Sequence, residues 1–198
     1  TLDSLSRQFT THHFVVVLVE NDAEGRAGLE AARSRFESGL LPGLAVVAHE
    51  RGNCSAYNAG FAAARRFLPK LEFVLVIDDD EEAEPSWIET LVETADRLGV
   101  DIVGGPQIPV FEQSGMDHLA THPVFRPAYE RTGEVPVLVS SGNVLIRARV
   151  LEAMGEPALD TRFNFTGGGD ADFFSRSRQK GFRFGWCREA VVRETVPA

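Results

Sequence analysis

Three consecutive carboxylates at positions 78–80 follow directly on the apolar run from Phe73 to Ile77. Such a run is typical of a strand covered on both faces, and open α/β sheets bind their ligands at the carboxyl ends of these strands. Because three adjacent negative charges repel, a partner should hold them together, and the simplest partner is a divalent cation that bridges to a phosphate-bearing substrate. The other interpretation is a solvated acidic turn, since glutamates continue the charge at positions 81, 82 and 84.

A second carboxylate with a chemical use is Asp170, which follows the glycines at positions 167–169 at the start of an expected helix. A helix N-terminus favours the ionised form of a carboxylate, and a general base must be ionised. The alternative is a helix cap after a glycine turn, because aspartate is also a preferred capping residue. The local pattern leaves both interpretations open.

The elements that must position these carboxylates are strands alternating with helices. Strands are expected at 14–19, 44–49, 73–77, 101–105, 107–111, 143–147, 182–186 and 190–193. Helices are expected at 26–38, at 55–68 with Ser55 as the N-cap, at 85–99, over a short stretch ending at Met154, and from 167 onwards. The region 112–139 has the least pattern and is expected to be a long functional or mobile loop. The order predicts an α/β fold whose first half is typical of nucleotide-binding domains, followed by a looser half with antiparallel character.

Composition narrows the class of protein. The chain has 198 residues, which favours one domain, and its net charge of −9 argues against a nucleic-acid-binding surface. Only two cysteines are present, Cys54 and Cys187, without metal-ligand spacing, so we expect structural thiols in a reducing compartment. No apolar stretch reaches the length of a membrane span and no signal peptide opens the chain, which makes the cytoplasm the expected location. Peripheral association with the inner face of the membrane stays open.

Six ordered segments together resemble family-2 glycosyltransferases of the GT-A fold, and the resemblance covers essentially the whole chain. These segments are 19–22, 55–65 with Asn58, 77–80 followed by 85–87, 141–147, 168–174 and 189–192. The segment 77–80 resembles the family's DxD motif, and 168–174 resembles the start of the helix that carries the catalytic base. The resemblance implies a GT-A nucleotide-diphospho-sugar transferase fold with a mostly parallel central sheet flanked by helices in three layers. It further implies a single domain, 1–198, with a nucleotide-sugar-binding half (1–105) and an acceptor or catalytic half (106–198).

By this resemblance, the protein is expected to be an inverting, metal-dependent glycosyltransferase that moves a sugar from a nucleotide-diphosphate donor to an acceptor hydroxyl, in polysaccharide or glycoconjugate synthesis. Asp170 would be the catalytic base, and Mg²⁺ or Mn²⁺ would be held by Asp80 with Asp78 and Glu194. A UDP-sugar is the favoured donor, and a saccharide or glycolipid the expected acceptor. The residues implied to contact the nucleotide sugar are Glu20, Asn21, Asn58, Asp78 and Asp79, and those on the acceptor side are Gly142, Asn143 and Asp172.

Several positions depart from the family pattern. The family normally begins with a strand and a nucleotide-contacting turn that this chain does not contain, so we expect the natural protein to have more N-terminal chain. Glu20 stands in place of the commoner Asp, Tyr57 in place of an Arg, and Gly169 in place of a Glu.

Two alternatives to a glycosyltransferase therefore stay open. One is a non-catalytic nucleotide-sugar-binding domain of the same fold, and the other is a sugar nucleotidyltransferase. A Rossmann dehydrogenase is excluded because no Gly-x-Gly-x-x-Gly turn is present.

Overall fold

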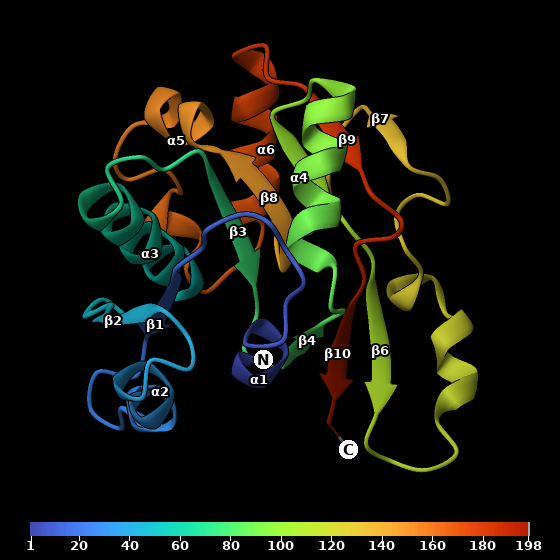
Figure 1. Ribbon diagram of the computed structural model, residues 1–198. Coiled ribbons are helices and arrows are strands. Elements are labelled where there is room, and N and C mark those ends of the chain that lie inside the picture. The colour runs from blue at the N-terminus through green and yellow to red at the C-terminus, as the bar shows by residue number, and fades with distance from the viewer. Residues whose placement is uncertain (198) are drawn as a thin grey trace.

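The computed structural model describes residues 1–197, and it places helices on both faces of a central sheet (Figure 1). The strands are β1 (Val16–Glu20), β2 (Gly43–Val47), β3 (Phe73–Ile77), β4 (Glu81–Ala83), β5 (Ile102–Gly104), β6 (Gln107–Phe111), β7 (Gly133–Val135), β8 (Asn143–Arg147), β9 (Phe184–Trp186) and β10 (Val192–Val196). The helices are α1 (Leu2–Leu5), α2 (Ala27–Glu37), α3 (Asn53–Phe67), α4 (Trp87–Leu98), α5 (Ala148–Met154) and α6 (Gly169–Gln179). Three short 3₁₀ turns complete the list: η1 (Asp117–Thr121), η2 (Pro123–Phe125) and η3 (Thr161–Phe163).

The strands form mixed sheets, which corrects the expected mostly parallel arrangement. The largest sheet has the order β3-β8-β5-β9-β7, and β8 runs antiparallel to both of its neighbours, β3 and β5. Between β6 and β8 the chain passes through η1, η2 and β7, and it enters β8 in the direction opposite to β3 and β5. A second sheet has the order β4-β10-β6, and a third contains β1 and β2 in parallel register.

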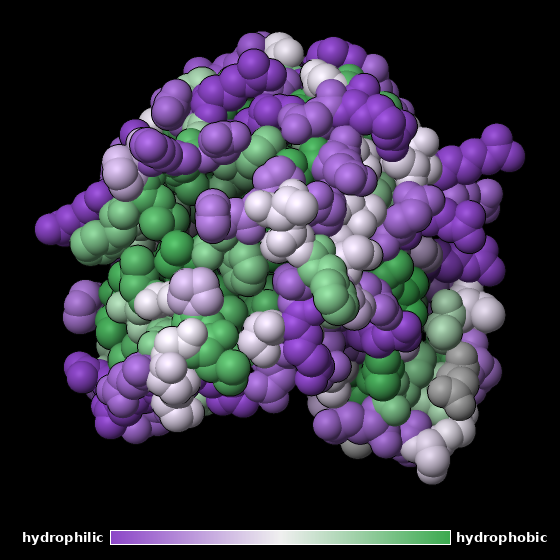
Figure 2. All heavy atoms as spheres, viewed as in Figure 1, coloured by the Kyte–Doolittle hydropathy of each residue, from purple (hydrophilic) through white to green (hydrophobic). Residues whose placement is uncertain are grey.

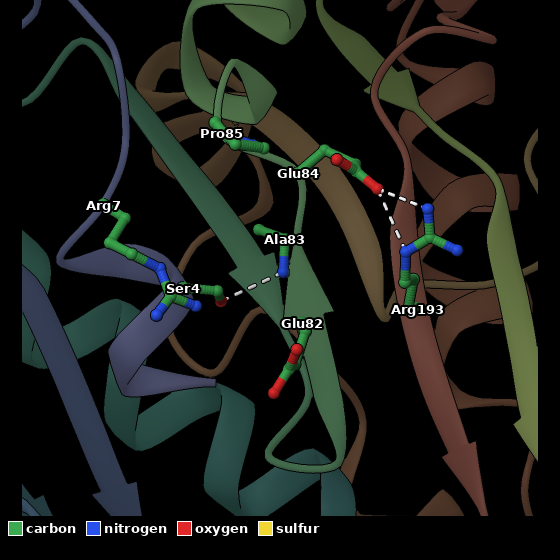
Figure 3. A pocket seen from close by; sticks show the side chains of 7 residues that line it. All are labelled: Ser4, Arg7, Glu82, Ala83, Glu84, Pro85 and Arg193. Atoms are coloured by element: carbon green, nitrogen blue, oxygen red, sulfur yellow. Dashed lines mark hydrogen bonds and ion pairs between the residues drawn. The ribbon is translucent and has the colours of Figure 1, made fainter.

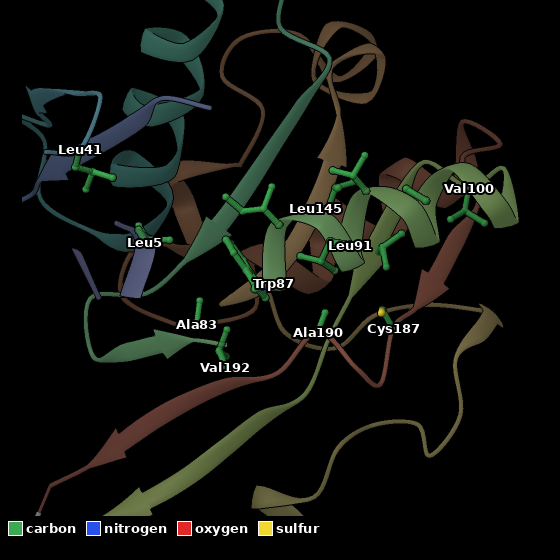
Figure 4. Close-up of a cluster of buried hydrophobic side chains, with 14 residues drawn as sticks. Leu5, Leu41, Ala83, Trp87, Leu91, Val100, Leu145, Cys187, Ala190 and Val192 are labelled. Carbon is green, nitrogen blue, oxygen red and sulfur yellow. The ribbon is translucent and has the colours of Figure 1, made fainter. Parts of the chain in front are cut away.

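Side chains on alternate positions of the central strands enter two separate cores. In β8, Leu145 packs with α4, while Val144 and Ile146 face the opposite way. The first core, drawn in Figure 4, gathers α4 side chains such as Trp87 and Leu91 with Val192 of β10. The second core contains Phe61 of α3, Leu151 of α5 and Phe174 of α6. The three-layer architecture predicted from the sequence is confirmed by this division.

One edge of β1 and one edge of β3 carry no strand partner within residues 1–197. β1 pairs with β2 alone and β3 pairs with β8 alone. The apolar residues of β3 are only half-buried, as are those of β1 before its last residue. Figure 2 accordingly shows hydrophobic surface on the left of the view, over the region where Figure 1 places β1, α3 and β3. Among the helices described, none is long and apolar enough to cross a membrane.

The short strand β4 was not expected from the sequence, and it determines the conformation of the acidic segment. Instead of one solvated run, the glutamates at 81 and 82 pair with β10 in antiparallel register. The turn 78–80 is thereby held between β3 and β4 and brought next to the end of the chain. Both termini lie on this side of the molecule (Figure 1).

Candidate active site

The carboxylates of the turn 78–80 meet a fourth carboxylate from β10. The backbone carbonyl of Asp80 accepts a hydrogen bond of 2.9 Å from Thr195 N–H, which fixes the turn against that strand. The register of β10 sets Glu194 opposite Glu81, so their side chains share one face of the strand pair. Burial raises the pKa of Glu194, and repulsion from Asp80 and Asp78 raises it further. Asp78, Asp80 and Glu194 therefore lie near enough for their charges to repel one another, and they form one acidic cluster.

This cluster has the donor chemistry of a magnesium or manganese site, since both ions prefer carboxylate and water oxygens. Asp78, Asp80 and Glu194 are thus the residues that could hold such an ion. Among the side chains described, however, no three His, Cys, Asp or Glu residues are already arranged to hold a metal ion. Water and phosphate oxygens would have to complete the coordination, as is usual for Mg²⁺ at phosphate sites.

A buried glutamate, Glu81, stabilises the acidic turn. The side chain of Glu81 is completely buried. Its Oε2 accepts a 2.9 Å hydrogen bond from Asp78 N–H, and its Oε1 accepts a 2.7 Å bond from Gln107 Nε2. Burial raises the pKa of Glu81 to about 7, against the partial opposition of these two bonds. Glu81 therefore holds the backbone of Asp78 in place, at the cost of a buried carboxylate.

The hydrogen bonds continue from Glu81 to the start of β8. Ser140 Oγ donates to Gln107 Oε1 at 2.7 Å, while Ser141 Oγ lies 3.2 Å from the Tyr57 hydroxyl, which donates to Asp78 Oδ1 at 3.2 Å. Burial raises the pKa of Asp78, with Asp80 and Asp79 adding repulsion, although Asp78 keeps an exposed surface. The bonds thus tie the acidic turn to the segment 140–142.

Gly142 lies at the centre of this network. A Cβ at that position would lie 2.6 Å from Gln107 Nε2, 2.7 Å from Asp78 Oδ2 and 3.2 Å from Glu81 Oε1. The expected acceptor-side residue Gly142 is thus in immediate contact with the acidic cluster, and the absence of a side chain is what permits the approach.

The Glu81→Gln variant should change how stability depends on pH. A carboxyl with a raised folded-state pKa contributes its full stability below the unfolded value of 4.5 and loses it as pH rises through about 7. The shift corresponds to about 3 kcal/mol. In chemical denaturation with EDTA present, Glu81→Gln should therefore gain stability relative to the wild type between pH 5 and pH 8. Glu82→Gln, which neutralises the exposed neighbour, is the control, and a difference that does not vary with pH would contradict the prediction.

The polar side chains at the end of β1 accept hydrogen bonds from backbone N–H groups of neighbouring loops. Glu20 is 8% exposed, and its carboxylate accepts from Asp22 N–H at 2.9 Å and from Gly28 N–H at 2.8 Å. Asn21 Oδ1 accepts from Gly52 N–H at 2.9 Å, just before α3. The predicted nucleotide-sugar residues of this strand thus shape the loops beside them, and their contact with a ligand stays a prediction.

Asp170 lies in the first turn of α6, as expected. The helix follows Gly167 and Gly168, whose φ angles of 73° and 89° lie in the left-handed region that favours glycine. Asp170 Oδ1 accepts a 2.8 Å bond from the neighbouring Ala171 N–H, and no side-chain bond to its carboxylate is present among the described residues. Asp172, by contrast, is engaged by Arg176 at 2.7 Å. Of the two aspartates, Asp172 is paired with an arginine, whereas Asp170 bonds only to the neighbouring backbone N–H.

Two further predicted site residues, Asn143 and Asn58, form hydrogen bonds with other parts of the protein. Asn143 is 2% exposed: its Oδ1 accepts from Trp87 Nε1 at 2.8 Å and its Nδ2 donates to the Pro106 and Ala190 carbonyls. Asn58 forms a pair of bonds with Leu159, described below. Trp87 and Trp186 are both core residues. Sequence reasoning missed the roles of Tyr57, Glu81 and Gln107, because their partners lie on other elements.

The pocket drawn in Figure 3 is separate from this cluster. It has a volume of about 190 Å³ and lies between α1 and β4, with Arg7 and Arg193 on its rim. The dashed lines mark the bonds from Ala83 N–H to Ser4 and from Arg193 to Glu84. None of the predicted site residues lines it.

Comparison with known proteins identifies the family of the chain. The model of the family described as glycosyl transferase family 2 matches residues 1–155. The chain belongs to glycosyl transferase family 2. It is 31% identical over 195 residues to the succinoglycan biosynthesis protein ExoM of Rhizobium meliloti (strain 1021), a match that covers 92% of this chain and 57% of the relative.

Solved structures show the same fold. S. aureus TarS 1–349 in complex with UDP superposes with a TM-score of 0.72 at 17% identity, covering 98% of this chain and 55% of that one. The complex of TarS with UDP-GlcNAc gives a TM-score of 0.66 at 17% identity, over 98% and 53% of the two chains. The predicted GT-A fold is confirmed, and the chain spans a little over half the length of ExoM and of TarS 1–349.

Proposed function

We propose that the protein is an inverting, metal-dependent glycosyltransferase that moves a sugar from a nucleotide-diphosphate donor to an acceptor hydroxyl during synthesis of a polysaccharide or glycoconjugate. The observation that carries this is the convergence of Asp78, Asp80 and Glu194 at a strand end. Asp170 lies at the start of α6, and the segment that leads into α6 is bonded to α3, the helix that also contacts Asp78. Family membership and the polysaccharide-related name of ExoM support the reaction class. The UDP and UDP-GlcNAc complexes of TarS favour a UDP-sugar as donor.

At the donor site, Asp80, Asp78 and Glu194 would hold Mg²⁺ or Mn²⁺. The ion supplies Lewis-acid stabilisation of the departing diphosphate. Asp79, exposed on the same turn, is free to hydrogen-bond the ribose, while Tyr57 and Glu81 keep Asp78 oriented. The net negative charge of the cluster explains why an anionic donor would not bind without the cation.

At the acceptor site, Asp170 takes the proton of the attacking hydroxyl. The acceptor oxygen forms a bond to the anomeric carbon as the bond from that carbon to the diphosphate oxygen breaks, and the nucleoside diphosphate leaves with the electron pair. An in-line displacement of this kind inverts the anomeric configuration. Asp170 would take this proton as a general base from its place in the first turn of α6.

Calorimetric titration of UDP tests the donor site. We expect binding in Mn²⁺ and none in EDTA, and we expect Asp80→Ala to weaken binding at least about 100-fold, or roughly 2.7 kcal/mol. Asp96→Ala, which removes an exposed carboxylate from the end of α4, is the matched control. Binding that needs neither the ion nor Asp80 would contradict the metal site. Failure of UDP, GDP and dTDP alike to bind a folded protein would contradict the nucleotide-sugar donor.

A further inference from the structure

Two asparagine side chains tie α3 to the segment that leads into Asp170. Asn58 Nδ2 donates to the Leu159 carbonyl at 2.8 Å, and Leu159 N–H donates to Asn58 Oδ1 at 2.9 Å. One primary amide therefore satisfies both backbone groups of a single residue, as a neighbouring strand would do. The two residues are 101 positions apart in the chain, so this contact fixes a long-range arrangement.

The second amide works in the opposite direction, from the segment to the helix. Asn164 Oδ1 accepts from Ser55 N–H at 2.9 Å, and Asn164 Nδ2 donates to Ser55 Oγ at 2.9 Å. Ser55 lies in the first turn of α3, where backbone N–H groups lack intrahelical partners. Asn164 thus caps the helix from outside. This corrects the expectation that Ser55 is the N-cap, a position that Gly52 occupies.

The segment held in this way has little regular structure of its own. Between α5 and α6 it contains only the turn η3, and Gly155, Gly167 and Gly168 all have positive φ angles. Close packing at its end adds to the two amide contacts: a Cβ at Gly169 would lie 2.4 Å from Cys54 Sγ. These contacts with α3, together with the buried Phe173 and Phe174, fix the direction in which the first turn of α6 presents Asp170.

The same helix also contacts the donor side. Tyr57, next to Asn58, donates to Asp78, and the N–H of Gly52, the N-cap of α3, donates to Asn21, just after β1. α3 is therefore the shared support of both halves of the site. A general base displaced by about 1 Å can lose about 100-fold in rate, so this support bears directly on turnover.

We propose that Asn58 and Asn164 are positioning residues, which hold the segment 159–169 on α3 and thereby fix Asp170 relative to the bound donor. The proposal rests on the function proposed above. Neither residue touches the substrates in this role; each acts through the backbone that carries the base. Asn58, by this assignment, supports the acceptor-side half rather than the nucleotide.

The variants are chosen by which bonds they remove. Asn58→Ala removes both bonds to Leu159. Asn58→Asp keeps the acceptor for Leu159 N–H but sets a carboxylate against the Leu159 carbonyl, so it should behave like the alanine variant. Asn164→Ala removes the cap, whereas Asn164→Asp should rescue it, because the N–H and hydroxyl of Ser55 can both donate to a carboxylate.

Gln8→Ala is the matched control. The Gln8 amide also makes a double contact with backbone, donating to the Glu84 carbonyl at 2.8 Å and accepting from Ile88 N–H at 3.1 Å. This contact ties the segment after α1 to the start of α4, away from Asp170. A general loss of stability would therefore appear in Gln8→Ala as well.

Two readouts separate positioning from general stability. Amide hydrogen exchange should become faster at residues 160–172 in Asn58→Ala, Asn58→Asp and Asn164→Ala, but not in Asn164→Asp or Gln8→Ala. The kcat for transfer should fall about 10- to 100-fold in the first three variants, while the UDP Kd in Mn²⁺ is unchanged. Unaltered exchange at 160–172, or a kcat loss no larger than that of Gln8→Ala, would overturn the proposal. Full turnover in Asp170→Asn would instead overturn the proposed role of Asp170 as a base. The two failures are distinguishable, because hydrogen exchange at 160–172 in the Asn58 variants does not depend on whether Asp170 is the base.

Discussion

Asp170→Asn is expected to lower kcat for sugar transfer by about 10²- to 10⁴-fold, the usual contribution of a general base. Asparagine has the shape of aspartate and keeps an oxygen for the Ala171 N–H, which Asp170 Oδ1 now accepts at 2.8 Å. The helix start should therefore survive the substitution, and only the capacity to take a proton is lost. Steady-state kinetics with a nucleotide-sugar donor, together with UDP titration, would measure both quantities.

The kcat of Asp170→Asn should be compared with its affinity for UDP. Loss of the base should leave the UDP Kd unchanged, because the donor cluster lies in the turn after β3 and on β10 rather than on α6. Asp96→Asn, an exposed aspartate paired with Arg147, should match the wild type in both measurements. Turnover that survives in Asp170→Asn would assign Asp170 to helix capping alone, the other interpretation of the sequence.

Gly142→Ala should disturb the fold and the donor site together. The added methyl would lie within 2.7 Å of Asp78 Oδ2 and 2.6 Å of Gln107 Nε2, and neither can move freely. Gln107 is held by Glu81 and Ser140, and Asp78 is held by Tyr57. Overpacking of this kind costs about 1–3 kcal/mol in stability. Because Asp78 is displaced as well, UDP affinity in Mn²⁺ should fall about 10-fold or more, a loss of roughly 1.4 kcal/mol.

Gly133→Ala provides the control for this substitution. Gly133 is the first residue of β7, and a Cβ there would have no heavy atom within 4 Å, so the change should be close to neutral. Thermal unfolding and UDP titration of the two variants side by side would test the prediction. A Gly142→Ala protein with normal stability and normal affinity would show that the polar network can relax, contrary to the rigidity inferred from its bonds.

Much of the fold could be predicted because its signals are local. The apolar run 73–77 and the segment 143–147 are strands, and Gly99 ends α4 in a left-handed conformation, as glycine at that position suggested. The strand directions were beyond such reasoning. Whether β8 runs parallel or antiparallel depends on where the loop 112–139 carries the chain, and no periodicity in β8 itself reports this.

The site could be predicted in its carboxylates but not in their supports. Glu81 follows three aspartates and so resembles an exposed acidic residue, yet pairing with β10 buries it completely. Tyr57 and Asn58 are neighbours on α3, but one bonds to Asp78 and the other to Leu159. Local pattern cannot indicate such partners, because the choice is made by the packing of elements far apart in the chain.

The contact between Gly169 and Cys54 has a consequence for how the two positions can vary. The thiol fills the space that a side chain at 169 would need, and the φ angle of Gly169 is not in the left-handed region, so volume alone excludes a larger residue. Positions 54 and 169 should therefore be substituted in concert across related chains. A chain with glutamate at the position of Gly169 should have glycine or alanine at that of Cys54. Placing a glutamate at position 169 would accordingly require a smaller residue at position 54 on the neighbouring helix. Gly169→Glu alone should clash with the Cys54 thiol, and a smaller residue at 54 alone should leave a cavity.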